Sequence, residues 1–129
     1  MCIRDREDND LDLWLCNGGS LSFYGHALNS KYFLEAMPFY AIRGDYLFVH
    51  AGVMPGVPLI KQKKKDLTWI RDRFLNAEDH GLPFTIVHGH SITEDFEVDV
   101  QPKRINIDTG AFCSGKLTAL PLEYEVDVD

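Results

Sequence analysis

Two short apolar runs in this chain each end on histidine, with glycine close behind. The first is Tyr46–Val49, which leads into His50, and the second is residues 84–87, which lead into His88, Gly89 and His90. Runs of this kind predict buried strands. Ligands bind outside the carboxyl ends of strands in open α/β sheets, so the repeated pattern predicts one shared site with an imidazole from each strand.

His50 and His90 are the candidate metal ligands of this site. Neutral imidazole binds zinc, manganese and iron, and small residues nearby leave room for backbone or substrate. A single histidine at a strand end is more often a packed or surface residue, and it is the repetition that favours a metal. His88 lies two residues before His90, which in a strand places both on one face. Two roles are therefore open for His88, a further ligand or a partner that orients one.

Two charged residues are candidates for supporting roles. The planar guanidinium of Arg71 can bind two phosphate oxygens at once, although without further context an ordinary surface arginine that pairs with Asp72 or Glu78 is favoured. Asp108 ends an expected strand, where its carboxylate either orients a ligand histidine or holds a turn, and holding a turn is the more common role. His26 and His80 lie in loop-like segments and are given no role.

The rest of the pattern predicts an α/β fold built from short elements. Gly44 and Asp45 form a hairpin turn between the first two strands. Apolar runs predict strands at residues 40–43, 46–51, 84–87, 104–108 and 117–122. Helical spacing predicts helices at residues 30–37 and 66–75 and a helix end at residues 11–16. Polar stretches predict loops at residues 53–65, 77–83 and 93–99 and a small-residue turn at residues 109–115.

Composition and charge exclude several classes of function. The 129 residues are 45% hydrophobic and 26% charged, which is typical of one globular domain or part of one. Thirteen basic and twenty acidic residues give a net charge of −7, which argues against a nucleic-acid partner. No apolar stretch approaches the roughly 20 residues that cross a bilayer, so no membrane partner is expected. The three cysteines share no CxxC spacing and indicate a reducing, cytoplasmic location.

Five segments, taken in order, resemble the calcineurin-like metallophosphoesterases. They are WLCNGG at 14–19, GDYLFVHAG at 44–52, DLTWIR at 66–71, HGHS at 88–91 and RINIDTGAFCSGKLTAL at 104–120. The likeness is to the carboxyl-terminal half of the bacterial branch that contains bacteriophage-lambda-type serine/threonine protein phosphatases and symmetrical diadenosine tetraphosphatases. Other branches have a histidine two positions after the GH pair, where this chain has Ile92.

The resemblance implies a four-layer α/β/β/α sandwich, of which this chain holds the second sheet and its flanking helices. It implies that His50 and His90 bind the second ion of a dinuclear centre, with Mn²⁺ the expected metal and Fe or Zn as alternatives. Arg71 matches an arginine that holds the phosphate, and residues 107–111 match a turn beside the site.

The implied reaction is the hydrolysis of phosphomonoesters on serine or threonine in a phosphoprotein. A phosphorylated small molecule is the alternative substrate, above all a dinucleoside polyphosphate cleaved symmetrically. A third alternative is a non-catalytic module that binds at most one metal ion.

The sequence departs from the family pattern in its first half. The motifs GDxHG, GDxxDRG and GNHE, which supply the remaining metal ligands and the general-acid histidine, do not occur in it. We therefore expect a chain truncated at its amino end and inactive, or nearly so, when alone. Residues 1–6 resemble the translation of a transposon-end adapter, so residues 1–10 are interpreted as a non-native or disordered leader. Residues 11–129 would then be the carboxyl-terminal portion of a metallophosphoesterase domain.

Overall fold

The computed structural model describes residues 31–123, which fall into two compact units divided after Pro38. In the first unit, helix α3 (Lys31–Ala36) confirms the helix expected over residues 30–37. The second unit begins at Phe39 and contains the sheet. The leader at residues 1–10, the helix end at residues 11–16 and the WLCNGG segment lie outside the described residues.

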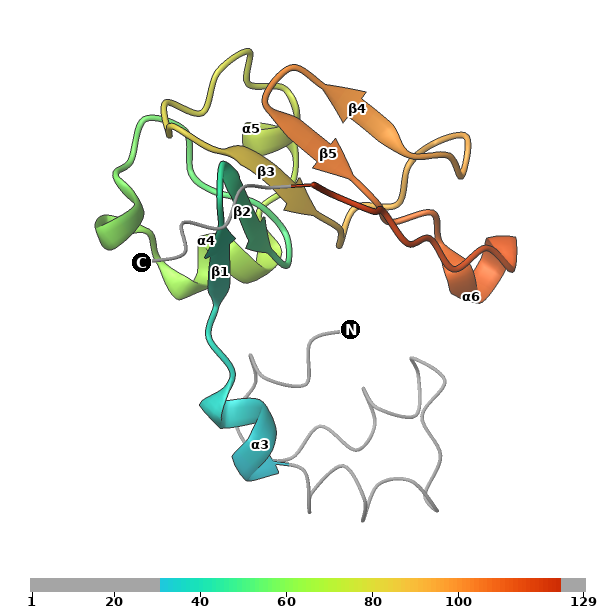
Figure 1. Ribbon diagram of the computed structural model, residues 1–129, viewed down its shortest axis with the longest axis horizontal. Helices are drawn as coiled ribbons and strands as arrows, with labels where there is room; N and C mark the ends of the chain where they lie inside the picture. Colours follow the sequence, from blue (N-terminus) through green and yellow to red (C-terminus); the bar gives the residue numbers. More distant parts are fainter. Residues whose placement is uncertain (1–30, 124–129) are drawn as a thin grey trace. The chain divides into compact units, whose positions relative to one another are not determined.

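Five strands form one mixed sheet in the second unit (Figure 1). In spatial order they are β1 (Tyr40–Arg43), β2 (Tyr46–Val49), β3 (Thr85–His88), β5 (Arg104–Asn106) and β4 (Asp99–Gln101). Strands β2, β3 and β5 are parallel, whereas the outer strands β1 and β4 are antiparallel to their neighbours. The carboxyl ends of the three parallel strands therefore meet at one end of the sheet, as the sequence predicted for β2 and β3.

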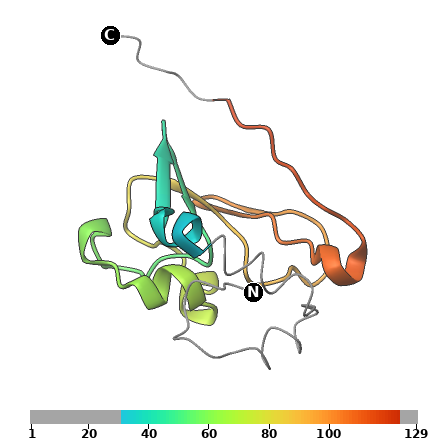
Figure 2. The ribbon, with the colours of Figure 1, turned by 90° about the horizontal axis from the view of Figure 1, so that it is seen from below.

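One face of this sheet carries the hydrophobic core. Leu47 of β2 pairs with Ile86 of β3, and both side chains are fully buried. Helices α4 (Lys64–Trp69) and α5 (Asp72–Leu75) lie on one side of the strands (Figure 2) and contribute Leu67 and Phe74 to the core. Each large apolar side chain buried in this way stabilises the fold by about 1.5–3 kcal/mol. The mixed α/β fold class is thus shown.

The single helix expected over residues 66–75 is wrong, because the structure has two short helices there. Helix α4 ends at Trp69, and the next residue, Ile70, has an extended backbone at φ −61° and ψ 143°. Arg71 then takes φ −131° and ψ −107°, and α5 begins after it. The segment contains no proline or glycine that would signal a break. The extended backbone at Ile70 still buries its side chain in the core, so packing has overridden the local helical pattern.

Four smaller expectations also need correction. The loop expected over residues 53–65 contains a short 3₁₀ helix, Leu59–Lys61, and the start of α4. Strand β4 was missed, and residues 109–115 contain the one-turn helix α6 (Ala111–Ser114). The strand expected over residues 117–122 is absent from the described chain, which continues there without regular structure. Residues 117–122 pair with neither of the sheet's edge strands, β1 and β4.

Every helix within residues 31–123 is too short or too polar to cross a lipid bilayer.

Candidate functional site

His50 and His90 lie side by side where β2 and β3 end. Nε2 of His50 is 3.2 Å from Nδ1 of His90, and the ring centroids are 5.0 Å apart. The backbone joins the same two loops, because the N–H of Gly89 donates to the carbonyl of His50 over 2.9 Å. The predicted convergence of the two imidazoles is therefore confirmed. Their role as metal ligands stays a prediction, and within residues 31–123 no third His, Cys, Asp or Glu joins them in a metal-binding cluster.

The backbone at His90 is strained. Its φ is +68°, and the N–H of Ser91 donates to the carbonyl of Gly89 over 2.8 Å, so His90 is the central residue of a γ-turn with positive φ. For a residue with a side chain this conformation costs on the order of 1–3 kcal/mol and persists only where surrounding contacts impose it. Such strain is common at functional sites, and here it sets the direction of the His90 imidazole.

Helix α4 contacts the chain beside His50 and the ring of His90. The N–H of Ala51, next to His50, donates to the carbonyl of Leu67 over 2.9 Å. The ring of Trp69, at the end of α4, meets the His90 ring edge-on with centroids 5.3 Å apart and planes at 83°. The segment DLTWIR therefore positions the histidines by its backbone and by its aromatic side chain.

Arg71 lies at the break between α4 and α5, beside the imidazole pair. Its side chain is exposed, and Nη1 is 3.4 Å from Oγ of Ser91, the residue that follows His90. The described residues contain no ion pair to Arg71, so the pairing with nearby carboxylates that the sequence also allowed is not found. The guanidinium is thus available to an anion at the end of the sheet where the histidines meet.

His88 lies in the core and not beside His90. Strand β3 ends at His88, and the positive φ of His90 breaks the alternation, so the expectation that both share one strand face is wrong. The His88 ring packs edge-on against Phe74 with centroids 4.9 Å apart. Its Nδ1 lies 3.2 Å from the carbonyl of Gly89, to which it donates if the proton is on that nitrogen.

Asp108 holds a turn, which is the more common of its two predicted roles. Its Oδ1 accepts from the N–H of Gly110 over 3.1 Å, and its carbonyl accepts from the N–H of Thr93 over 3.0 Å. Among the described residues no hydrogen bond joins its carboxylate to His50, His88 or His90. The carboxylate does lie close to the HGHS loop, because a Cβ added at Gly89 would be 3.7 Å from Oδ2.

Burial lowers the pKa of two histidines at this end of the sheet, His88 and His90. Burial, followed by the charge of Arg71 and the neighbouring His50, lowers the pKa of His90 to about 4. Burial is also the largest cause that lowers the pKa of His88 to about 4. Within the described part of the chain, the Nε2 atoms of both residues are buried without a hydrogen-bond partner. Neutral imidazole is the form that binds a metal. The unpartnered nitrogen of His90 is Nε2, whereas its Nδ1 is the atom that faces His50.

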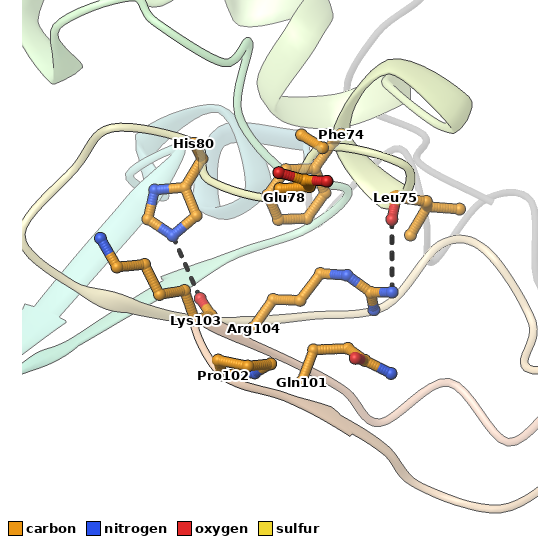
Figure 3. Close-up of a pocket in the computed structure, with 9 residues that line it drawn as sticks. Phe74, Leu75, Glu78, His80, Gln101, Pro102, Lys103 and Arg104 are labelled. Carbon is orange, nitrogen blue, oxygen red and sulfur yellow. Dashed lines mark hydrogen bonds between the residues drawn. The ribbon is translucent and has the colours of Figure 1, made fainter.

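A cavity lies at the opposite end of the sheet (Figure 3). It encloses about 310 Å³ between the end of α5 and the β4–β5 turn, and His80, Lys103 and Arg104 line it. Both nitrogens of His80 have partners, because Nδ1 accepts from the N–H of Leu82 and Nε2 contacts the carbonyl of Lys103. Lys103 pairs with Asp79 and Arg104 with Asp99. The cavity contains neither candidate ligand, and the groups that could hold an anion are already paired.

Three residues contact the site but were not among its predicted residues: Asn106, Trp69 and Ser91. Asn106 is the polar residue inside the strand pattern R-I-N-I-D, at a position that the structure buries. A buried amide at the carboxyl end of a parallel strand is a signal that could have been used, because such a group needs partners in the adjoining loops. Trp69 was visible only as the neighbour of Arg71.

No protein-family model matches this sequence, and a comparison with curated proteins finds no relative. The assignment to the metallophosphoesterases is therefore a proposal that stands on the motifs and on the geometry of the histidines.

Proposed function

We propose that this chain is part of a metal-dependent phosphoesterase, closest in type to the serine/threonine protein phosphatases, and that it supplies one side of a dinuclear metal centre. The fold would be the carboxyl-terminal portion of the four-layer sandwich, with residues 11–129 belonging to that domain. His50 and His90 would bind one ion, with Mn²⁺ expected and Fe or Zn as alternatives, and Arg71 would bind the phosphate.

The observation that carries this proposal is the distance between the two imidazole nitrogens. Nitrogens that are each about 2.1 Å from one ion lie about 3.0–3.4 Å from each other at coordination angles of roughly 90–109°. Nε2 of His50 and Nδ1 of His90 are 3.2 Å apart. This spacing supports one shared ion between the two side chains.

The charges around the pair suit a phosphate. Arg71 lies beside the histidines through its contact with Ser91, and a guanidinium can donate two parallel hydrogen bonds to a phosphate group. When bound, two metal ions supply a water of lowered pKa and neutralise charge that develops on the phosphoryl oxygens. In this arrangement His50 and His90 would bind the metal through these nitrogens, and Arg71 would orient the phosphate.

The residues present in this chain complete only part of such a centre, which gives a direct test. The GDxHG, GDxxDRG and GNHE motifs are absent from its sequence. With Mn²⁺ and p-nitrophenyl phosphate we expect at most a trace rate from this chain alone. Turnover at an ordinary enzymatic rate, about 1–1,000 per second, would contradict the partial-site proposal.

The substrate class is tested with a chain extended to include those motifs. Its activity toward a phosphoserine peptide is compared with that toward diadenosine tetraphosphate, with His90→Ala as the inactive control. We expect the phosphopeptide to be preferred. A preference for the dinucleotide would replace the phosphoprotein substrate with the symmetrical hydrolase reaction and leave the metal proposal unchanged.

One observation favours the non-catalytic alternative. At 3.2 Å, Nε2 of His50 and Nδ1 of His90 can also share a single N–H hydrogen bond without any metal. In that case the histidines would pack against Trp69 and serve only stability. Titration with Mn²⁺ separates the two, because a packing pair binds no ion.

A further inference from the structure

Asn106 is a buried amide that bonds to two loops at once. It is the last residue of β5 and is 3% exposed. Its Nδ2 donates to the carbonyl of Ser91 over 2.8 Å, and its Oδ1 accepts from the N–H of Asp108 over 3.0 Å. Ser91 belongs to the loop after β3 and Asp108 to the turn after β5, so one side chain joins the HGHS and IDTG segments.

The bond to Ser91 acts on the strained turn at His90. The N–H of Ser91 closes that γ-turn by donating to Gly89, and the carbonyl of Ser91 is held by Asn106. Both polar groups of the Ser91 backbone are thus fixed, one within the turn and one from the neighbouring strand. A left-handed backbone at a non-glycine residue relaxes unless its surroundings hold it. Among the described residues, Asn106 makes the side-chain bond to the Ser91 backbone, while Arg71 contacts the Ser91 hydroxyl.

We propose that Asn106 is a positioning residue that keeps His90 in its strained conformation and so sets its imidazole against His50. The positioning is a property of the metal-free chain, and only its consequence for metal binding rests on the proposed function. The bond to Asp108 is a local one of the kind that asparagine makes two residues ahead in turns, so the positioning role rests on the bond to Ser91, 15 residues away in the chain.

Two substitutions separate the two bonds. In Asn106→Thr, the hydroxyl can still accept from the N–H of Asp108, as threonine does in comparable turns, but it has no amide that reaches Ser91. Asn106→Leu removes both bonds at similar side-chain volume. The matched control is Gln62→Met, because the Gln62 amide also joins loop backbone, bonding Met54 and Val57 away from the HGHS loop.

The first readout is nuclear magnetic resonance of the chain without metal. In the wild type we expect a nuclear Overhauser contact between the His50 and His90 rings, and slow exchange of the Ser91 amide with solvent. Asn106→Thr should lose the ring contact and speed Ser91 exchange at least about 10-fold, while Gln62→Met changes neither. The proposal is overturned if Asn106→Thr keeps both signals. It is also overturned if Ser91 of the wild type exchanges as fast as exposed loop amides, a measurement that requires no variant to fold.

The second readout is Mn²⁺ affinity, which a purely structural role would not change selectively. We expect Asn106→Thr to weaken Mn²⁺ binding about 10- to 100-fold, as loss of a residue that orients a ligand does, with Gln62→Met close to the wild type. Equal weakening in both variants would reduce Asn106 to a general stabilising residue and overturn its positioning role. If the wild type shows the ring contact but binds no Mn²⁺, the proposed function fails, and the first readout still decides the role of Asn106.

Discussion

The two ends of the sheet both contain histidine and arginine, but they differ in how fully their polar groups are paired. At the amino ends of the parallel strands, both nitrogens of His80 have partners and Arg104 is paired with Asp99. At the carboxyl ends, His88 and His90 each have a buried nitrogen without a partner in the described chain. Stable interiors satisfy their polar groups, so the exception points to the end where a ligand would bind.

The backbone shows the same contrast. The strained γ-turn lies at His90, whereas the β4–β5 turn beside the cavity contains no residue of positive φ. The cavity in Figure 3 is lined by two cations, Lys103 and Arg104, that are both paired with carboxylates. The strained turn at His90 and the two unpaired buried nitrogens of the described chain therefore lie at the end with the histidine pair, and not beside the cavity.

The largest effect is expected at Phe74, which contacts both ends. Its ring packs against His88 at 4.9 Å and lies 6.3 Å from His80. Phe74→Ala should lower the free energy of unfolding by about 3–5 kcal/mol in urea denaturation. Leu75→Ala, in the same helix but only partly buried, is the control and should cost clearly less. Equal losses of unfolding free energy in the two variants would show that the contacts of Phe74 at the two ends of the sheet add no particular stability.

The second-largest effect on stability is expected at low pH, through His88 at the carboxyl end of β3. His88 is neutral in the fold because burial lowers its pKa to about 4, whereas an unfolded histidine titrates near 6.5. The unfolded chain therefore binds more protons between these values, and stability is complete above pH 6.5 and falls toward pH 4. The loss should be at most about 3 kcal/mol.

The comparison variant for this pH dependence is His88→Gln, which cannot titrate. Urea denaturation at intervals from pH 7 to pH 4.5 should show a shallower decline for the variant than for the wild type. If the unfolding free energy of both proteins declined in parallel, groups other than His88 would cause the loss of stability in acid.

The two ion pairs beside the cavity should differ in strength. The Arg104–Asp99 pair is largely shielded, with side chains 14% and 32% exposed, whereas the Lys103–Asp79 pair is about half exposed on both sides. Arg104→Met should cost about 1.5–3 kcal/mol of unfolding free energy, because it leaves bonded charged groups without their partner. Lys103→Met should cost less than about 1 kcal/mol. The reverse order would show that the cavity is not the fully paired end described above.

The smallest effect on stability is expected at Arg71. Its side chain is exposed, so Arg71→Ala should change the free energy of unfolding by less than about 0.5 kcal/mol. The same substitution should weaken binding of inorganic phosphate to the Mn²⁺-treated chain by about 10-fold, through loss of a charge-assisted contact. Arg73→Ala, an exposed arginine of α5, is the control and should leave phosphate binding unchanged. Equal effects of both would show a general charge effect and no phosphate site at Arg71.

The sequence predicted the parts of the fold that local patterns encode. The hairpin at Gly44, the strand that ends at His88 and the convergence of His50 with His90 all follow from apolar runs and from the geometry of parallel strands. The break at Ile70 could not be predicted, because it arises from burial against the sheet and has no local signal.

The candidate site was predictable in its ligands but not in what holds them. Strand alternation placed His88 beside His90, and only the positive φ of His90 shows that the two diverge. The role of Asn106 depends on its hydrogen bond to Ser91, 15 positions away in the chain, which no periodic pattern encodes. Long-range contacts thus determine the details of this end of the sheet.

The most direct test of the account is a titration of the purified chain with Mn²⁺, followed by electron paramagnetic resonance. We predict that the wild type binds one ion per chain, that His50→Ala and His90→Ala each abolish this binding, and that His80→Gln at the opposite end retains it. Binding that survives both substitutions, or a wild type that binds no ion at millimolar Mn²⁺, would contradict a metal site at the carboxyl ends of the strands.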